Sequence, residues 1–133
     1  MAAVLSLDAG SPAGSAWPRA ILRLEGAAAF AASATLYAHA GFSWLLFAVF
    51  FLAPDLAMLS YLMNPRIGAA AYNVAHTYAL ALPLALVGFL AGLPAILMAA
   101  LIWIAHIGFD RALGYGLKYP TRFGDTHLGR IGR

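Results

Sequence analysis

Six polar residues that could take part in chemistry lie within the apolar stretches of this chain. They are Glu25, Asp55, Asn73, His76, His106 and Asp110. An ionisable side chain in the core of a lipid bilayer is costly, so such residues rarely persist there without a role. We therefore expect these side chains to form one functional site.

The spacing of the six residues predicts that they converge. His106 and Asp110 are four residues apart, so they share one face of a helix. Asn73 and His76 are three residues apart, with Tyr72 on the same stripe. Counting inward at ~1.5 Å per residue from the basic end of each apolar segment places all six residues about 10 to 16 Å deep. The sequence thus predicts a single polar layer in one half of a membrane.

This layer has the ligand types of a divalent metal site. Imidazole together with carboxylate favours Zn, Fe(II) or Mn. We expect His76, His106, Asp110 and Asp55 to be the metal ligands, which leaves Glu25 as a general base on a water bound to the metal. In a second arrangement Asp110 only orients His106. No contiguous metal motif such as HExxH is present.

The residues predicted to be catalytic are Glu25, Asp55, Asn73 and Asp110. A zinc-dependent hydrolase of an ester or amide fits this set of groups. Isomerisation or cyclisation by acid–base chemistry of Glu25 and Asp55 alone is an alternative.

Each of these residues also has a purely structural interpretation. His76 or His106 taken singly fits a hydrogen-bonded histidine in a helix interface. Asp110 fits a pair with Arg111 or Arg23 near the membrane surface. Asp55 is harder to explain in this way, because no basic residue lies near it in the sequence.

The composition indicates an integral membrane protein. Of the 133 residues, 63% are hydrophobic and only 10% are charged, whereas a soluble domain carries about 25% charged residues. The net charge of +3 comes from basic residues that flank apolar segments, which is typical of membrane anchoring and not of nucleic-acid binding. The chain has no cysteine, so disulfides and thiolate metal sites are excluded.

Four segments are long and apolar enough to span a bilayer, and the predicted fold is an all-α four-helix transmembrane bundle. The expected helices cover residues 18–38, 42–63, 67–90 and 94–117. Pro18 suits the first position of the first helix. We divide the chain into a flexible N-terminal segment (1–17), a transmembrane domain (18–117) and a basic cytoplasmic tail (118–133).

The basic residues predict the orientation of this bundle. With four spans, all eight Lys and Arg residues lie at one end and the two opposite turns contain none. Because basic flanks stay in the cytoplasm, both termini are predicted to be cytoplasmic. The short connections predict adjacent, antiparallel neighbours in an up-down-up-down order.

The leading functional hypothesis is a small intramembrane enzyme that acts on a lipid-like substrate from the cytoplasmic side. The side chains expected to line an apolar approach are Phe51, Met58, Trp103 and Phe109. A proton- or ion-coupled transporter or channel subunit is the alternative, since intramembrane Asp, Glu and His residues relay protons and bind ions. A structural membrane subunit is a third hypothesis, and a homodimer is compatible with all three.

Four stretches of the chain resemble a known family. They are Pro54-Asp55-Leu56, Asn73-Val74-Ala75-His76-Thr77-Tyr78, His106-Ile107-Gly108-Phe109-Asp110-Arg111 and Gly114-Tyr115-Gly116-Leu117-Lys118. They resemble small bacterial four-helix membrane proteins classed as a domain of unknown function, over residues 22–132. The resemblance implies the fold and a bacterial inner-membrane location. A fainter similarity is to membrane hydrolases of the alkaline ceramidase kind, although this chain has fewer helices and lacks their full histidine set.

Overall fold

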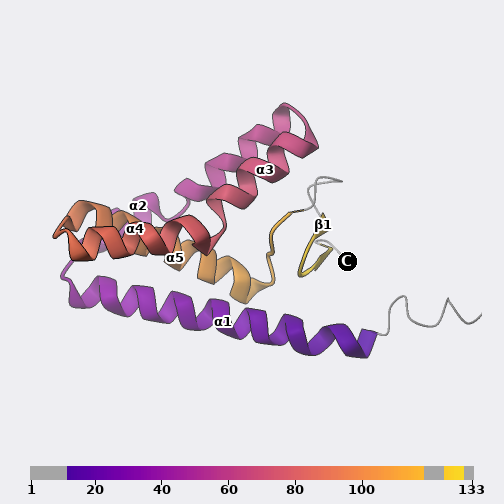
Figure 1. The fold of residues 1–133 in the computed structure, drawn as a ribbon, viewed down its shortest axis with the longest axis horizontal. Helices are drawn as coiled ribbons and strands as arrows, with labels where there is room; N and C mark the ends of the chain where they lie inside the picture. The colour runs from indigo at the N-terminus through magenta and orange to yellow at the C-terminus, as the bar shows by residue number, and fades with distance from the viewer. Residues whose placement is uncertain (1–11, 119–124, 131–133) are drawn as a thin grey trace, which may run out of the picture.

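The computed structural model describes residues 12–118 and 125–130, and these residues form an all-α fold with one pair of two-residue strands (Figure 1). The elements are α1 (Pro12–His39), α2 (Trp44–Phe50), the 3-10 helix η1 (Ala53–Leu62), α3 (Pro65–Ala75), α4 (Tyr78–Leu90), α5 (Pro94–Leu113), β1 (Asp125–Thr126) and β2 (Gly129–Arg130). The predicted all-α class is confirmed.

Two of the four predicted helices are broken. The segment expected at 42–63 consists of α2 followed by η1, and Pro54 stands in the first turn of η1. Because proline disfavours the helical conformation of the residue before it, a break at this point is expected from local chemistry. The segment expected at 67–90 is divided at His76 and Thr77 into α3 and α4.

The predicted ends of the first and last helices also need correction. Helix α1 begins at Pro12, so Pro18 lies inside the helix and not at its first position. Residues 1–11 lie outside the described part of the chain. Helix α5 ends at Leu113 and not at 117, because Gly114 adopts a left-handed conformation with φ of 94° and caps the helix.

Helix α5 is the centre of the fold, with α1 and α4 packed along it (Figure 1). Two glycines allow α1 and α5 to approach closely. A Cβ atom on Gly108 would lie 2.5 Å from the carbonyl oxygen of Gly26 and 2.7 Å from the amide nitrogen of Phe30. Small residues permit this kind of backbone contact between membrane helices.

The elements η1 and α3 form a helical hairpin that diverges from the rest of the molecule (Figure 1). Only Met63 and Asn64 separate its two arms, and the Asn64 side chain accepts a hydrogen bond of 2.8 Å from the amide of Ile67 at the start of α3. This η1–α3 hairpin packs on itself, so its position relative to α5 depends on a small number of side-chain contacts.

Within the described residues, three segments are long and apolar enough to cross a membrane. They are Trp44–Leu62, Pro65–Leu90 and Pro94–Leu113. Helix α1 is not one of them, because Arg19, Arg23 and Glu25 lower the mean hydropathy of its first half. The composition and these three helices agree with a membrane protein.

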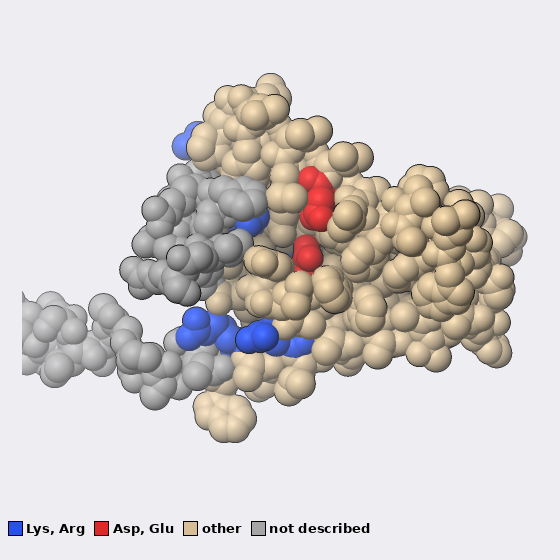
Figure 2. Space-filling model, turned by 180° about the vertical axis from the view of Figure 1, so that it is seen from behind, with Lys and Arg blue, Asp and Glu red and all other residues tan. Residues whose placement is uncertain are grey.

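The described Lys and Arg side chains gather at one end of the molecule (Figure 2). This is the end at which α1 begins and β1 lies (Figure 1). The turns at 40–43 and 91–93 contain no basic residue. The described basic residues are therefore concentrated at one end of the long axis of the helices.

Candidate metal centre

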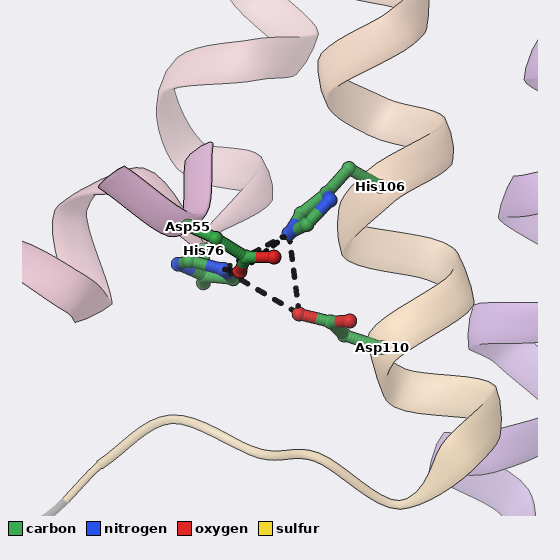
Figure 3. Close-up of side chains that lie close together, drawn as sticks. All are labelled: Asp55, His76, His106 and Asp110. Carbon is green, nitrogen blue, oxygen red and sulfur yellow. Dashed lines mark hydrogen bonds and ion pairs between the residues drawn. The ribbon is translucent and has the colours of Figure 1, made fainter. Parts of the chain in front are cut away.

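Four of the six predicted site residues meet at one point. They are Asp55 from η1, His76 from the end of α3, and His106 and Asp110 from α5 (Figure 3). One ligand atom of each side chain lies within 4.8 Å of the other three. The four-residue spacing on α5 turns His106 and Asp110 to the same side, as the sequence predicts.

The separations between these atoms match a tetrahedral metal site. The two Nε2 atoms are 3.1 Å apart, and each lies 3.2 Å from Oδ1 of Asp55. Oδ2 of Asp110 lies 3.4 Å from Nε2 of His76 and 3.3 Å from Nε2 of His106. Nitrogen and oxygen ligands about 2.0 Å from a tetrahedral zinc ion are separated by ~3.3 Å. Five of the six edges of the tetrahedron thus have the expected length.

The hydrogen bond at the far side of His76 supports a cation at the centre. Nδ1 of His76 lies 2.9 Å from the carbonyl oxygen of Tyr72, which can only accept, so Nδ1 carries a proton. In the neutral ring Nε2 then has a lone pair, and this lone pair faces two carboxylate oxygens and the other imidazole. Converging lone pairs repel one another unless a proton or a metal ion lies between them. A metal ion would satisfy all four ligand atoms at once.

The four ligands differ in exposure to solvent. The side chains of His76 and His106 are 0% and 1% exposed, and Asp110 is 14% exposed. Asp55 is 30% exposed and belongs to a 3-10 helix with no buried residue. The other ring nitrogen of His106, Nδ1, is buried and has no well-formed hydrogen bond among the described residues. Three ligands are therefore enclosed, whereas Asp55 is the accessible member of the group.

The break between α3 and α4 is stabilised by side chains from α5. Arg111 donates a hydrogen bond of 2.9 Å from Nη2 to the carbonyl of His76, and Trp103 donates from Nε1 to the carbonyl of Ala75. The Thr77 hydroxyl accepts a hydrogen bond from the Ala79 amide at the start of α4. Carbonyls released by a broken helix must find partners within the protein when no water is present. These contacts fix the end of α3 and so hold the His76 side chain beside that of His106.

Arg111 and Trp103 thus have roles that sequence reasoning missed. Arg111 bonds to the carbonyls of His76 and Tyr115 and not to Asp110. Trp103 was expected only as an apolar wall. The contacts that these two side chains make with the end of α3 span 28 and 35 residues of the chain, so no local spacing could have indicated them.

Asn73 and Glu25 lie outside the group of four. Asn73 donates from Nδ2 to the carbonyl of Lys118 at 2.8 Å and accepts from the Lys118 amide at 2.6 Å. Glu25 is exposed on α1 and is not part of the group of potential ligands. The catalytic roles expected of these two residues stay predictions.

An apolar cavity of about 450 Å³ adjoins the four potential ligands. Its lining contains Pro54 and Ala75, which are the chain neighbours of Asp55 and His76. The remaining lining residues are Phe50, Ala53, Met98, Ala99, Ile102 and Trp103. Of the four lining residues predicted from the sequence, only Trp103 belongs to this set.

Two others of the predicted lining residues, Phe51 and Phe109, form an aromatic cluster against His106. The ring centroid of Phe51 lies 5.3 Å from that of His106 and 5.7 Å from that of Phe109. Phe51 therefore packs against the imidazole of His106 and against Phe109, and neither ring lines the cavity.

Residues 19–131 match the family described as Domain of unknown function (DUF4260). The chain belongs to this family. The predicted membership is confirmed, and all four potential ligands of the DUF4260 chain lie within the matched region. No curated protein and no solved structure is detectably similar to the chain.

Proposed function

We propose that the chain is a small intramembrane metalloenzyme that acts on a lipid-like substrate. One divalent metal is held by His76, His106 and Asp110, and Asp55 is the fourth, displaceable ligand or the base. The observation that supports this proposal is the set of tetrahedral separations between four side chains from three elements. Residues of this set on different elements are at least 21 positions apart in the chain, so their convergence is a property of the fold.

The donor set favours particular metals and a particular chemistry. Two imidazoles with two carboxylates suit Zn, Fe(II) or Mn, and edges near 3.3 Å favour tetrahedral Zn. A metal ion held here would supply Lewis-acid polarisation of a carbonyl or phosphoryl oxygen of a substrate. His76 and His106 would hold the ion, and the more accessible Asp55 would serve as a fourth ligand or as the base that takes a proton from water. Hydrolysis of an ester or amide is the reaction class that these roles fit.

The apolar cavity supports a lipid-like substrate. Pro54 and Ala75 line this cavity and are the chain neighbours of Asp55 and His76. An alkyl chain in the cavity would therefore lie next to these two potential ligands. The cavity is almost wholly apolar, as ligand pockets commonly are apart from a few placed polar groups. The polar head of an amphipathic molecule would then meet Asp55 and the metal.

We propose further that the four helical segments cross the bacterial inner membrane in an up-down-up-down order. Helix α1 is the fourth span in this arrangement, and both termini lie in the cytoplasm with the basic end of the molecule (Figure 2). The positive-inside rule supports this orientation. A homodimer is compatible with this arrangement.

A transporter of a divalent cation is the second candidate function. One observation counts against catalysis, namely that four protein ligands would fill a tetrahedral site and leave no open position. Catalytic zinc sites keep such a position, whereas closed sites do not. The behaviour of Asp55 separates the two functions.

The first test is elemental analysis of the detergent-purified chain after loading with Zn, Fe(II) or Mn. We expect close to one metal per chain in the wild type and at least a tenfold loss in His76→Ala and His106→Ala. His39→Ala is the matched control, because His39 is an exposed histidine at the C-terminal end of α1. A metal-free wild-type protein after loading would overturn the proposal.

The second test separates the enzyme from the transporter. Zinc uptake into proteoliposomes and hydrolysis of fluorescent lipid esters and amides are measured on the same preparation. The enzyme predicts turnover without flux, and the transporter predicts flux without turnover. In either case His106→Ala should abolish the measured activity.

A further inference from the structure

The chain that follows α5 folds back onto α3 beside the metal centre. We call its described residues, 114–118 and 125–130, the C-terminal strap. Lys118 forms an isolated bridge with Thr126, and His127 exchanges two hydrogen bonds with Leu117. The strap passes beside the four ligands as an extended segment (Figure 3). It is an ordered element with its own pairing and not an unstructured tail.

The strap is fixed to α3 by one residue. The Asn73 side chain donates to the carbonyl of Lys118 and accepts from its amide, so both backbone groups of Lys118 are satisfied by one amide side chain. Lys118 as a whole is only 4% exposed. This explains Asn73, which sequence reasoning placed in the pocket.

Lys118 is connected to the potential metal ligand His76 through the aromatic ring of Tyr72. Nζ of Lys118 lies 4.7 Å from the centroid of the Tyr72 ring. The Tyr72 ring also stacks on the His76 imidazole, with centroids 3.7 Å apart and planes inclined by 8°. The Tyr72 carbonyl also accepts from Nδ1 of His76. Tyr72 therefore orients the imidazole by both its ring and its backbone.

The charges around Lys118 also support a link between this residue and the proposed metal site. Burial lowers the pKa of Lys118, and the negative charges of Asp110 and Asp55 oppose this effect. The two carboxylates of the metal centre therefore lie close enough to stabilise the ammonium group. A cation over the ring of Tyr72 is favourable in a site shielded from water.

We propose that the C-terminal strap is a positioning element of the metal centre, in which Asn73 fixes Lys118, Lys118 holds the Tyr72 ring, and Tyr72 sets the orientation of His76. This inference rests on the proposed metal site. Residues that orient metal ligands commonly contribute 10- to 100-fold to metal affinity. Lys118 and Asn73 are positioning residues because they act through Tyr72.

The test measures Zn²⁺ affinity of the full chain in detergent by competition with a chromophoric chelator. We expect Lys118→Met and Asn73→Ala to weaken Zn²⁺ binding about 10- to 100-fold, and Lys118→Arg to restore most of it by keeping a cation over the ring. Arg66→Met is the matched control, because it removes an exposed cation from the tip of the hairpin. The visible absorption spectrum of the Co²⁺-loaded protein should change in the two strap variants and stay unchanged in the control.

Two controls distinguish failure of the proposed metal site from failure of the proposed role of the strap. A wild-type chain that binds no Zn²⁺ refutes the proposed function itself, whereas variants that bind as tightly as a binding wild type refute only the role of the strap. Helical content by circular dichroism identifies a variant that fails to fold. Gly116→Ala is a second variant, because its Cβ would lie 2.5 Å from Nδ1 of His127, which hydrogen-bonds to Leu117 within the strap. Unchanged Zn²⁺ affinity in folded Lys118→Met and Asn73→Ala proteins overturns the inference.

Discussion

The two carboxylates of the metal centre are not equivalent. Asp110 is 14% exposed and lies one turn after His106, whereas Asp55 is 30% exposed on a loosely packed 3-10 helix. We expect Asp110→Asn to lower metal affinity by at least ~100-fold, the upper range for residues that only orient ligands. Asp55→Asn should keep close to one metal per chain and abolish turnover. Both are measured by elemental analysis and lipid-ester hydrolysis of the same samples, and equal metal loss in the two variants would favour a closed site.

At the same scale, the sequence predicted the four convergent residues but not their neighbours. His106 and Asp110 were predicted by their spacing on a continuous helix. Asn73 and His76 were expected to share a face, but His76 lies just beyond the end of α3 with φ of −118° and ψ of 23°, so helical spacing no longer applies. The depth of a residue along a helix does not determine which side of the helix its side chain faces. Glu25 was expected in the pocket from its depth alone, and its side chain is exposed.

At the scale of elements, the number of helical segments was predictable and their breaks were only partly so. Pro54 is a visible signal for the division between α2 and η1. The division at His76 and Thr77 has no proline, and only the capping hydroxyl of Thr77 marks it in the sequence. Its stability comes from Arg111 and Trp103, which are distant in the chain. Long-range contacts of this kind cannot be inferred from periodicity.

The four potential metal ligands join two parts of the fold, which also meet through the hydrogen bonds of Trp103 and Arg111 to the end of α3. Asp55 and His76 belong to the η1–α3 hairpin, and His106 and Asp110 belong to α5. A bound ion should therefore fix the hairpin against α5, and its removal should release it. We expect a narrow distance distribution between spin labels at Leu62→Cys and Leu113→Cys in the metal-loaded protein, and a broader one after chelation, measured by double electron–electron resonance. Both residues are exposed, so the labels should not disturb the packing.

The control for this experiment is a pair of labels across the packed helices α1 and α5. Leu24 and Leu113 are both exposed, and their helices are held together by the close approach at Gly26 and Gly108. This distance should not respond to chelation. A hairpin distance that is equally insensitive would show that side-chain packing, and not the ion, fixes the hairpin.

At the scale of the whole molecule, the separation of charge along the helices determines the predicted orientation. Composition was sufficient to predict a membrane protein, because the low charge content is independent of any contact. The positions of the charges carry the finer prediction. Arg66, at the tip of the hairpin, shares the basic end with the start of α1 and the end of α5, whereas the turns at 40–43 and 91–93 carry no basic residue. Transferring that end across a membrane would oppose the positive-inside rule.

Single cysteines test this orientation directly, because the chain has none of its own. Met63→Cys lies at the basic end, while Ala40→Cys and Ala91→Cys lie in the opposite turns, and all three positions are exposed. In intact bacterial spheroplasts, a membrane-impermeant maleimide should label Ala40→Cys and Ala91→Cys and leave Met63→Cys unlabelled. Permeabilised cells should show labelling at all three positions, which controls for reactivity. The reverse pattern would place the basic end outside the cell, and the strap and Asp55 would then face the periplasm.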